Sequence, residues 1–303
     1  SAPRFYEVKR QLIKHWCNSE SNKPISQLFA LLNSELIPSM ASSLELAGEL
    51  ESIEFREFVE FRHSLFDRVY AEVLLYGNWN TSQAVGINQQ IRHQFQACDR
   101  VAEAKRSIVA LSRQETAVLT KSIEHPDSAA ALYVQGLIQD SEQADDVLEK
   151  ALYILVSQIL APFSFNFLRM ENQLGYLAGS GYMPLCNTPG LVLYVQSHDQ
   201  ASAHLVANLN ACLLAFLDEL YDMSQEEFIK HKNAVIHQYE EQPANLNQKC
   251  QQLWVSIGNK DYDFTQKQRI VAELDAIELT QLRNWCRANL TPERLTGACL
   301  STE

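Results

Sequence analysis

The eight histidines of the sequence are the residues that would reveal metal chemistry most directly. They occur at positions 15, 63, 93, 125, 198, 204, 231 and 237. A zinc site built on one helix needs the spacing His-Glu-x-x-His or His-x-x-Glu-His, because these spacings turn the ligands toward one face. Neither spacing occurs, and the pairs 198/204 and 231/237 are six residues apart, which directs them to different helix faces. We therefore expect no metal in this chain, with its histidines in surface or capping positions.

Other catalytic motifs are missing in the same way. The sequence has no Gly-x-Ser-x-Gly elbow and no Walker loop, and the glycines of residues 175–181 have the wrong spacing for a dinucleotide. Its seven cysteines are scattered and never form a Cys-x-x-Cys pair, so we expect free thiols rather than disulfides or a zinc knot. Taken alone, the sequence shows no catalytic centre.

The stretch from Leu168 to Tyr176 is the most informative polar segment. It places Arg169 at the foot of an apolar helix and then enters a strand through Gln173, Gly175 and Tyr176. An arginine in this position can cap the carbonyls of the helix end, and a strand tyrosine is commonly a packing residue. Both side chains can also donate hydrogen bonds to developing negative charge. The residues alone leave these roles open.

The spacing Arg-x-x-x-Gln-Leu-Gly-Tyr, just before a strand hairpin, resembles the signature of the C-terminal half of the insulysin/pitrilysin family of zinc metallopeptidases. The segments 71–78, 190–197 and 228–239 also resemble segments of that family in the same order. The resemblance therefore covers nearly the whole chain. One departure is Asn172, which stands where relatives often have an acid.

The resemblance implies four homologous α+β domains around a closed chamber, with the zinc motif in a first domain that this chain does not contain. It implies that Arg169 and Tyr176 act as catalytic groups that bind the substrate carbonyl and the oxyanion, and that Gln173 and Gly175 bind substrate. Zinc is then a cofactor of the full-length enzyme, held by the absent N-terminal half, and none is expected in this chain. The implied partners are peptide substrates and the N-terminal half of the same polypeptide.

Two functions follow from this resemblance. In the first, the chain is the non-zinc half of a metalloendopeptidase, inactive by itself, which encloses the chamber and binds the substrate backbone and oxyanion. In the second, it is a catalytically dead peptide-binding scaffold or a relative of a processing subunit. Retention of both Arg169 and Tyr176 favours the first, because a dead binder has no need of oxyanion donors.

The elements that must position these residues are mostly helical, with a few strands. Apolar spacing, capping boxes and turn residues predict helices at 5–16, 25–37, 54–63 and 81–98, one opened by Asp140 and Gln143 and kinked or ended at Pro162, one reaching Leu220, one capped by Ser224 and Glu227, and others to Asn289. The same signals predict a loop at 125–128, a turn at 188–190, and strands at 68–76, 129–135, 174–185, 191–197 and 294–300.

An internal repeat organises these elements. Residues 50–58 align with 274–282, Phe5, Lys9 and Ile13 align with Phe228, Lys232 and Ile236, and the strand at 68 aligns with that at 294. We therefore predict an α+β fold of two homologous sandwich-like domains, each a mixed or antiparallel sheet covered by helices. Residues 1–107 are the C-terminal part of a third peptidase-like domain, and residues 108–303 are most of a fourth.

Composition restricts the partners. The formal charge is −12, from 37 acids against 25 Lys and Arg. This charge excludes a surface that follows nucleic-acid phosphates or an anionic membrane. No apolar run reaches 18 residues, so we expect no membrane span, and the N-terminal residues do not form a signal peptide. The compartment stays open between periplasm and cytoplasm, because unpaired thiols fit a reducing compartment while bacterial relatives are often exported.

Overall fold

A computed structural model describes residues 1–95, 99–103, 106–112, 116–138, 147–292 and 295–303. The described chain divides into two compact units that are not contiguous in sequence. The first unit comprises residues 1–17, 43–106 and 242–264, and the second comprises residues 18–42, 107–241 and 265–303. The predicted division into 1–107 and 108–303 therefore stays a prediction about sequence repeats, since each compact unit takes segments from both sides of it.

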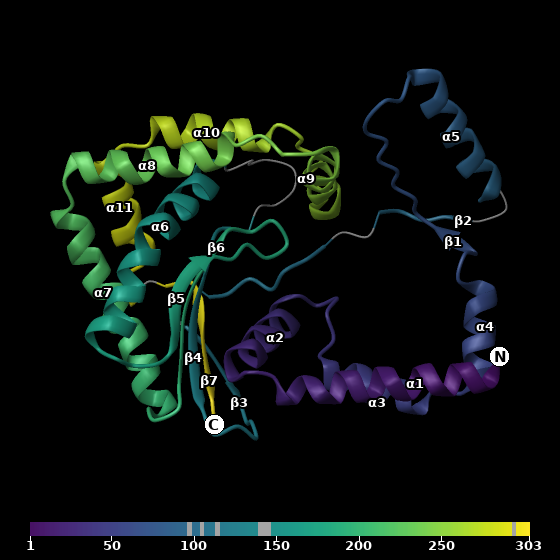
Figure 1. Cartoon of the computed structure of the whole chain (residues 1–303), viewed down its shortest axis with the longest axis horizontal. Coiled ribbons are helices and arrows are strands. Elements are labelled where there is room, and N and C mark those ends of the chain that lie inside the picture. Colours follow the sequence, from purple (N-terminus) through teal and green to yellow (C-terminus); the bar gives the residue numbers. More distant parts are fainter. Residues whose placement is uncertain (96–98, 104–105, 113–115, 139–146, 293–294) are drawn as a thin grey trace. The chain divides into compact units, whose positions relative to one another are not determined.

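The second unit is built on a five-stranded mixed sheet with the order β3-β7-β4-β6-β5. β3 pairs parallel with β7, and every other pair is antiparallel. The strands are β3 (Ala117–Lys121), β4 (Ser128–Gln135), β5 (Leu177–Tyr182), β6 (Gly190–Ser197) and β7 (Gly297–Thr302). A mixed sheet covered by helices confirms the predicted α+β fold class (Figure 1).

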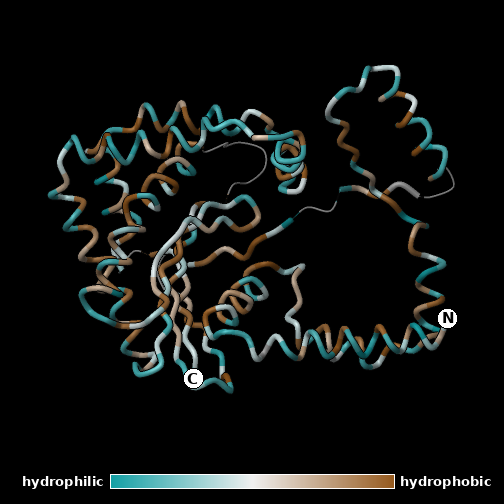
Figure 2. The backbone as a smooth tube through the Cα atoms, in the orientation of Figure 1, coloured by the Kyte–Doolittle hydropathy of each residue, from teal (hydrophilic) through white to brown (hydrophobic). Residues whose placement is uncertain are grey.

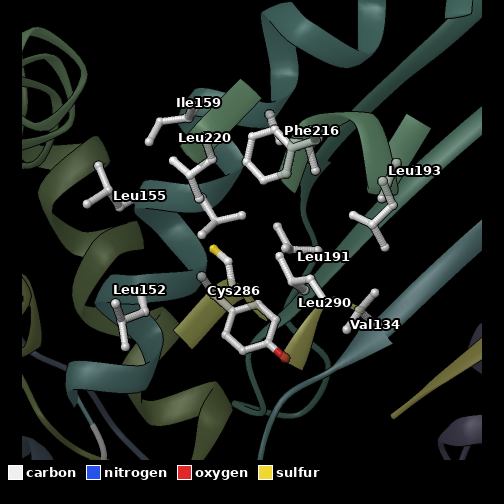
Figure 3. Packing of buried hydrophobic residues seen from close by; sticks show 14 of the residues in the cluster. Val134, Leu152, Leu155, Ile159, Leu191, Leu193, Phe216, Leu220, Cys286 and Leu290 are labelled. Atoms are coloured by element: carbon white, nitrogen blue, oxygen red, sulfur yellow. The ribbon is translucent and has the colours of Figure 1, made fainter. Parts of the chain in front are cut away.

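One face of this sheet packs on long apolar helices. The helices of this layer are α6 (Val147–Phe165), α7 (Ser202–Asp222), α8 (Gln225–Glu240), α10 (Gln266–Ala276) and α11 (Leu279–Asn289). Figure 3 shows how Leu152, Leu155 and Ile159 of α6 gather with Leu191 and Leu193 of β6 and with Phe216 of α7. Apolar side chains on nearly every side of α6 are thus buried, as its all-round hydrophobicity predicts.

The other face is covered by α2 (Pro24–Leu36) (Figure 1). Ile25, Leu28, Leu32 and Leu36 of this helix are buried against alternate residues of β4, of which Tyr133 is the largest. Because both faces of β4 are covered, the strand reads as a continuous apolar run rather than as an alternation. This run is brown along the middle of the sheet in Figure 2. A short 3-10 turn at Asn18–Ser21 precedes α2.

The first unit is mostly helical and has little buried surface. It contains α1 (Ala2–Cys17), α3 (Ser43–Ser52), α4 (Phe55–Ser64), α5 (Thr81–Gln94) and α9 (Leu246–Asn259), with a short parallel pair of β1 (Arg68–Val69) and β2 (Asp99–Arg100). No described residue of α1, α4 or α5 is buried. The Lys260 ammonium and the Tyr262 hydroxyl, just after α9, bind Glu72 and so tie this loop to the extended segment 70–76.

The two sequence copies share a specific lysine contact. Lys9 Nζ donates to the carbonyls of Glu51 and Ile53, both at 2.8 Å. Lys232 Nζ donates to the carbonyls of Asp275 and Ile277, at 2.9 and 3.3 Å. These carbonyls are 224 residues apart in the two copies and the lysines 223, which are the offsets of the repeat. In each case the lysine satisfies carbonyls at the end of a helix, which has no intrahelical donors left.

Replacement of this lysine tests the shared contact. We expect Lys232→Met, which keeps the aliphatic stem, to lower the free energy of unfolding by about 1 kcal/mol. Its neighbour Lys230, which pairs only with Glu226 on the exposed face of α8, provides the matched control as Lys230→Met. Thermal or urea unfolding measures both. Equal effects of the two variants would contradict a special role for Lys232.

Several predicted boundaries are wrong. Only Arg68 and Val69 of the predicted strand 68–76 are paired, since a strand needs a neighbour and the described residues give one only at β2. The helix does not end at Pro162, because α6 continues to Phe165. The last strand runs from Gly297 to Thr302 instead of 294–300. The sequence reasoning missed α3 and β3, and the predicted capping box at Asp140 and Gln143 lies outside the described residues.

Two helices have the length and apolar composition of a membrane span. They are Val147–Glu171, which joins α6 to the π-helix after it, and α7. The core helix of a folded unit has the same properties, and α6 is packed against the sheet with most of its residues buried. Length and composition are therefore weak evidence for a membrane here.

Candidate functional site

Arg169 lies in a widened turn that extends α6. A π-helix, η2 (Asn166–Glu171), follows α6 directly, and π turns are frequent at functional sites. The guanidinium is exposed and lies over the ring of Phe165, 5.3 Å from its centroid. The carbonyl of Phe167 at this helix end receives the backbone N–H of Asn172 at 3.2 Å and its side-chain amide at 2.9 Å. Asn172 thus caps this carbonyl and leaves Arg169 facing solvent.

The backbone reverses between Asn172 and Tyr176. Gln173 has a φ of 49°, in the left-handed region, and its side chain is exposed. Gly175 passes so close to β6 that a Cβ atom would lie 2.1 Å from the carbonyl oxygen of Gln196. The space beside this glycine is therefore filled by the protein's own strand, whereas we expected it to be open to a substrate backbone. Substrate binding by Gln173 and Gly175 stays a prediction.

The close approach at Gly175 makes a sharp prediction. We expect Gly175→Ala to destabilise the second unit by about 1–3 kcal/mol or more, because its Cβ meets backbone that cannot move aside. Gly181→Ala in β5 is the matched control, since nothing lies within 4 Å of a Cβ built there. Urea unfolding of the two variants would settle the comparison. Equal stability would mean that the loop shifts freely.

Tyr176 projects its hydroxyl into a small polar cluster. The ring is 47% exposed, and the hydroxyl donates to Asp127 Oδ2 at 2.7 Å. The buried side chain of Gln196 donates through Nε2 to the same carboxylate oxygen at 2.8 Å, and through the same nitrogen to the Tyr176 hydroxyl. The phenol is therefore fixed by two hydrogen bonds while half of its ring remains accessible.

The strand register explains why these three residues meet. Gln196 of β6 pairs with Ala129 of β4 on one side and with Leu177 of β5 on the other. Asp127 lies two residues before Ala129 in the loop that leads into β4, and Tyr176 lies one residue before Leu177. Two antiparallel ladders thus bring the loop ends together over one strand.

The electrostatics of the cluster couple the acid and the phenol. The hydrogen bond from Tyr176 holds the pKa of Asp127 below its usual value, with Gln196 and the charges of His125 and His198 acting in the same direction. The hydrogen bond to Asp127 in turn raises the pKa of Tyr176. At neutral pH the site therefore holds a carboxylate beside a protonated phenol.

The structure relates the predicted residues in different ways. Arg169 and Tyr176 both present polar groups to solvent, but no contact joins them among the described residues. Asp127 and Gln196 were not predicted. The sequence contained one signal for Asp127, the His125-Pro126-Asp127 loop before a buried strand, and none for Gln196.

The donor set does not form a metal centre. Among the described residues, no group of three His, Cys, Asp or Glu side chains could hold a metal ion. The described part of the chain therefore does not fit the zinc that the sequence resemblance implies for the complete enzyme. What the cluster can do is bind: a guanidinium and a phenol are donors suited to carbonyl oxygens and to oxyanions.

The fold and the cluster define an α+β peptidase-type domain with polar donors and no metal ligand set. The family described as "PQQ synthase PqqF-like, C-terminal lobe domain 4" matches residues 155–254, which include Arg169 and Tyr176. The insulin-degrading enzyme of Drosophila melanogaster is 25% identical over 90% of this chain and 28% of its own length. The chain thus spans about a quarter of that relative.

Solved structures agree in fold. The crystal structure of pitrilysin superposes with a TM-score of 0.85 at 21% identity, covering 100% of this chain and 31% of that one. A peptidase M16 inactive domain from Pseudomonas fluorescens gives a TM-score of 0.68 at 16% identity, covering 100% of this chain and 71% of that one. The resemblance to the C-terminal half of the insulysin/pitrilysin family is therefore confirmed.

Proposed function

We propose that the chain is the non-zinc C-terminal half of an insulysin/pitrilysin-like metalloendopeptidase. In this role it helps to enclose the substrate chamber, and Arg169 and Tyr176 bind the substrate carbonyl and the oxyanion. The observation that carries the proposal is the exposure of both side chains at the entrance of β5, where Asn172 caps the helix end and Asp127 and Gln196 hold the phenol. A packing arginine and tyrosine would not need this support.

The exposed apolar surface of the first unit supports a polypeptide partner. Phe58 is 40% exposed and Phe66 is 59% exposed, whereas Leu282 and Leu290, 224 residues later in the second copy, are 0% exposed. In the second copy these positions belong to the core formed with the sheet and α6. We propose that the N-terminal part of the same enzyme covers the equivalent residues of the first unit, since soluble proteins rarely leave such patches open.

The hydrolytic chemistry then belongs to the complete enzyme. There, zinc held by the N-terminal half would activate water, while this chain supplies donors to the substrate. Guanidinium and phenol donors act most strongly where water is excluded, which a closed chamber provides. The substrates are peptides small enough to be enclosed.

The alternative is a peptide-binding scaffold without hydrolysis. It is favoured by the likeness in fold to a domain that is described as an inactive peptidase M16 domain. A scaffold would keep the chamber and the peptide contacts but would have no use for a donor to the oxyanion. The two proposals therefore differ in turnover and agree in binding.

Metal content and turnover test the proposal. We expect the 303-residue chain to bind less than stoichiometric zinc after dialysis and to hydrolyse no peptide, because its described residues offer no ligand set. The complete enzyme should cleave a fluorogenic peptide and lose this activity to a chelator. About one zinc per isolated chain would contradict the first expectation, and a complete protein that binds peptide without cleaving it would favour the scaffold.

A further inference from the structure

The Tyr176 hydroxyl has one proton, and the structure uses it internally. A phenol can donate one hydrogen bond and accept others. Here it donates to Asp127 and accepts from Gln196. In this arrangement no proton remains for a substrate carbonyl, so donation to an oxyanion requires the O–H to leave Asp127.

The direction of these hydrogen bonds is fixed from the other side of the cluster. Gln196 is fully buried, and its Oε1 accepts from the backbone N–H of Ile25 at 3.3 Å. Ile25 lies in the first turn of α2, where backbone N–H groups have no intrahelical partner. Because the amide oxygen faces α2, the amide nitrogen must face Asp127 and Tyr176. The phenol oxygen is then the acceptor from Gln196, and its proton goes to Asp127.

The loop that carries Asp127 is also braced. The backbone N–H of Asp127 donates to His125 Nδ1 at 3.0 Å, which closes a tight turn just before β4. The carboxylate therefore approaches Tyr176 from a fixed point on the sheet rather than from a free loop. The other charged or titratable groups near it are His125 and His198, both of which favour its ionised form.

We propose that Asp127, oriented by Gln196 and α2, is a positioning residue for Tyr176. It holds the O–H in place and gives it up to the oxyanion when substrate is bound. This inference rests on the proposed function and adds to it a residue outside the Arg-x-x-x-Gln-Leu-Gly-Tyr motif. The exchange breaks no covalent bond: the O–H rotates from Asp127 Oδ2 to the substrate oxygen, and the amide of Gln196 continues to donate to the carboxylate.

The coupling can be measured in the 303-residue chain without any activity. Ultraviolet titration of the chain, minus that of its Tyr176→Phe variant, isolates the ionisation of Tyr176. We expect this ionisation to move to lower pH in Asp127→Asn, because the acceptor loses its charge. Asp199→Asn removes an exposed acid beyond the end of β6, which accepts from Ser197 instead, and should leave it unchanged. An unchanged titration in Asp127→Asn would overturn the inference.

The role in turnover is tested in the complete enzyme by a double-mutant cycle. We expect Asp127→Ala to lower kcat roughly 10- to 100-fold, and Asp127→Asn, which keeps an acceptor oxygen, to restore most of the loss. In the Tyr176→Phe background, Asp127→Ala should have no further effect, because it acts through the hydroxyl. An equal loss in both backgrounds would reduce Asp127 to a structural role. If Tyr176→Phe itself leaves turnover unchanged while the titration shift persists, the coupling stands and the proposed function fails.

Discussion

A fragment of residues 107–303 is expected to fail to fold, although it contains all five strands of the main sheet. It lacks α2, whose Ile25, Leu28, Leu32 and Leu36 cover one face of that sheet. Without the helix, Tyr133 and its neighbours on β4 would face water, and an apolar sheet face of this size promotes aggregation. We expect the fragment to show no cooperative thermal transition, and a fusion of residues 18–42 to restore one. A cooperative transition in the fragment alone would contradict the role of α2.

A point variant measures the same contact in the full chain. Leu32 is fully buried, so Leu32→Ala should lower the free energy of unfolding by about 2–5 kcal/mol through lost burial and the cavity left behind. Leu44 of α3 is 49% exposed, and Leu44→Ala should change it by no more than about 0.5 kcal/mol. Similar losses in the two variants would show that α2 is only loosely attached.

Tyr176→Phe in the complete enzyme is expected to lower kcat by about 10²–10³, or 2.7–4 kcal/mol in the transition state. The change removes the hydroxyl and keeps the ring, so turnover should fall without a matching fall in the thermal midpoint. Asp127 keeps Gln196 as a donor, and the half-exposed ring opens no cavity. Arg169→Lys should also be poorly tolerated, because it keeps the charge but loses the planar fork.

The control for this prediction is an exposed tyrosine elsewhere. Tyr221, near the end of α7, is 61% exposed and contacts the guanidinium groups of Arg283 and Arg287. Tyr221→Phe should leave kcat unchanged. Unaltered turnover in Tyr176→Phe, or a loss accompanied by a large drop in the thermal midpoint, would return Tyr176 to a packing role.

Local signals in the sequence predicted local structure well. The capping box of Ser224 and Glu227 is formed in both directions, with Glu227 N donating to Ser224 Oγ at 3.2 Å and Ser224 N to Glu227 Oε2 at 3.0 Å. The turn at 188–190 and its hairpin are also present, as β5 and β6 pair antiparallel. Such features depend on residues a few positions apart, whose propensities the sequence shows directly.

Features that depend on distant partners could not be predicted in this way. The segment 70–76 has strand composition, but it stays unpaired among the described residues beyond Val69, because composition does not supply a neighbour. Likewise, Tyr176 was found by its motif, whereas its partners Asp127 and Gln196 are 49 and 20 residues away. Only the register of the sheet brings them together.

The position of β7 has a consequence for the order of folding during synthesis. This strand lies between β3 and β4 and pairs with both, yet it is the last of the described elements to leave the ribosome. Until it emerges, β3 has no neighbour in the sheet and β4 is an open edge, which must be protected from pairing with other chains. The second unit should therefore complete its sheet after synthesis rather than during it, and do so slowly, because its central pairing joins residues far apart in sequence.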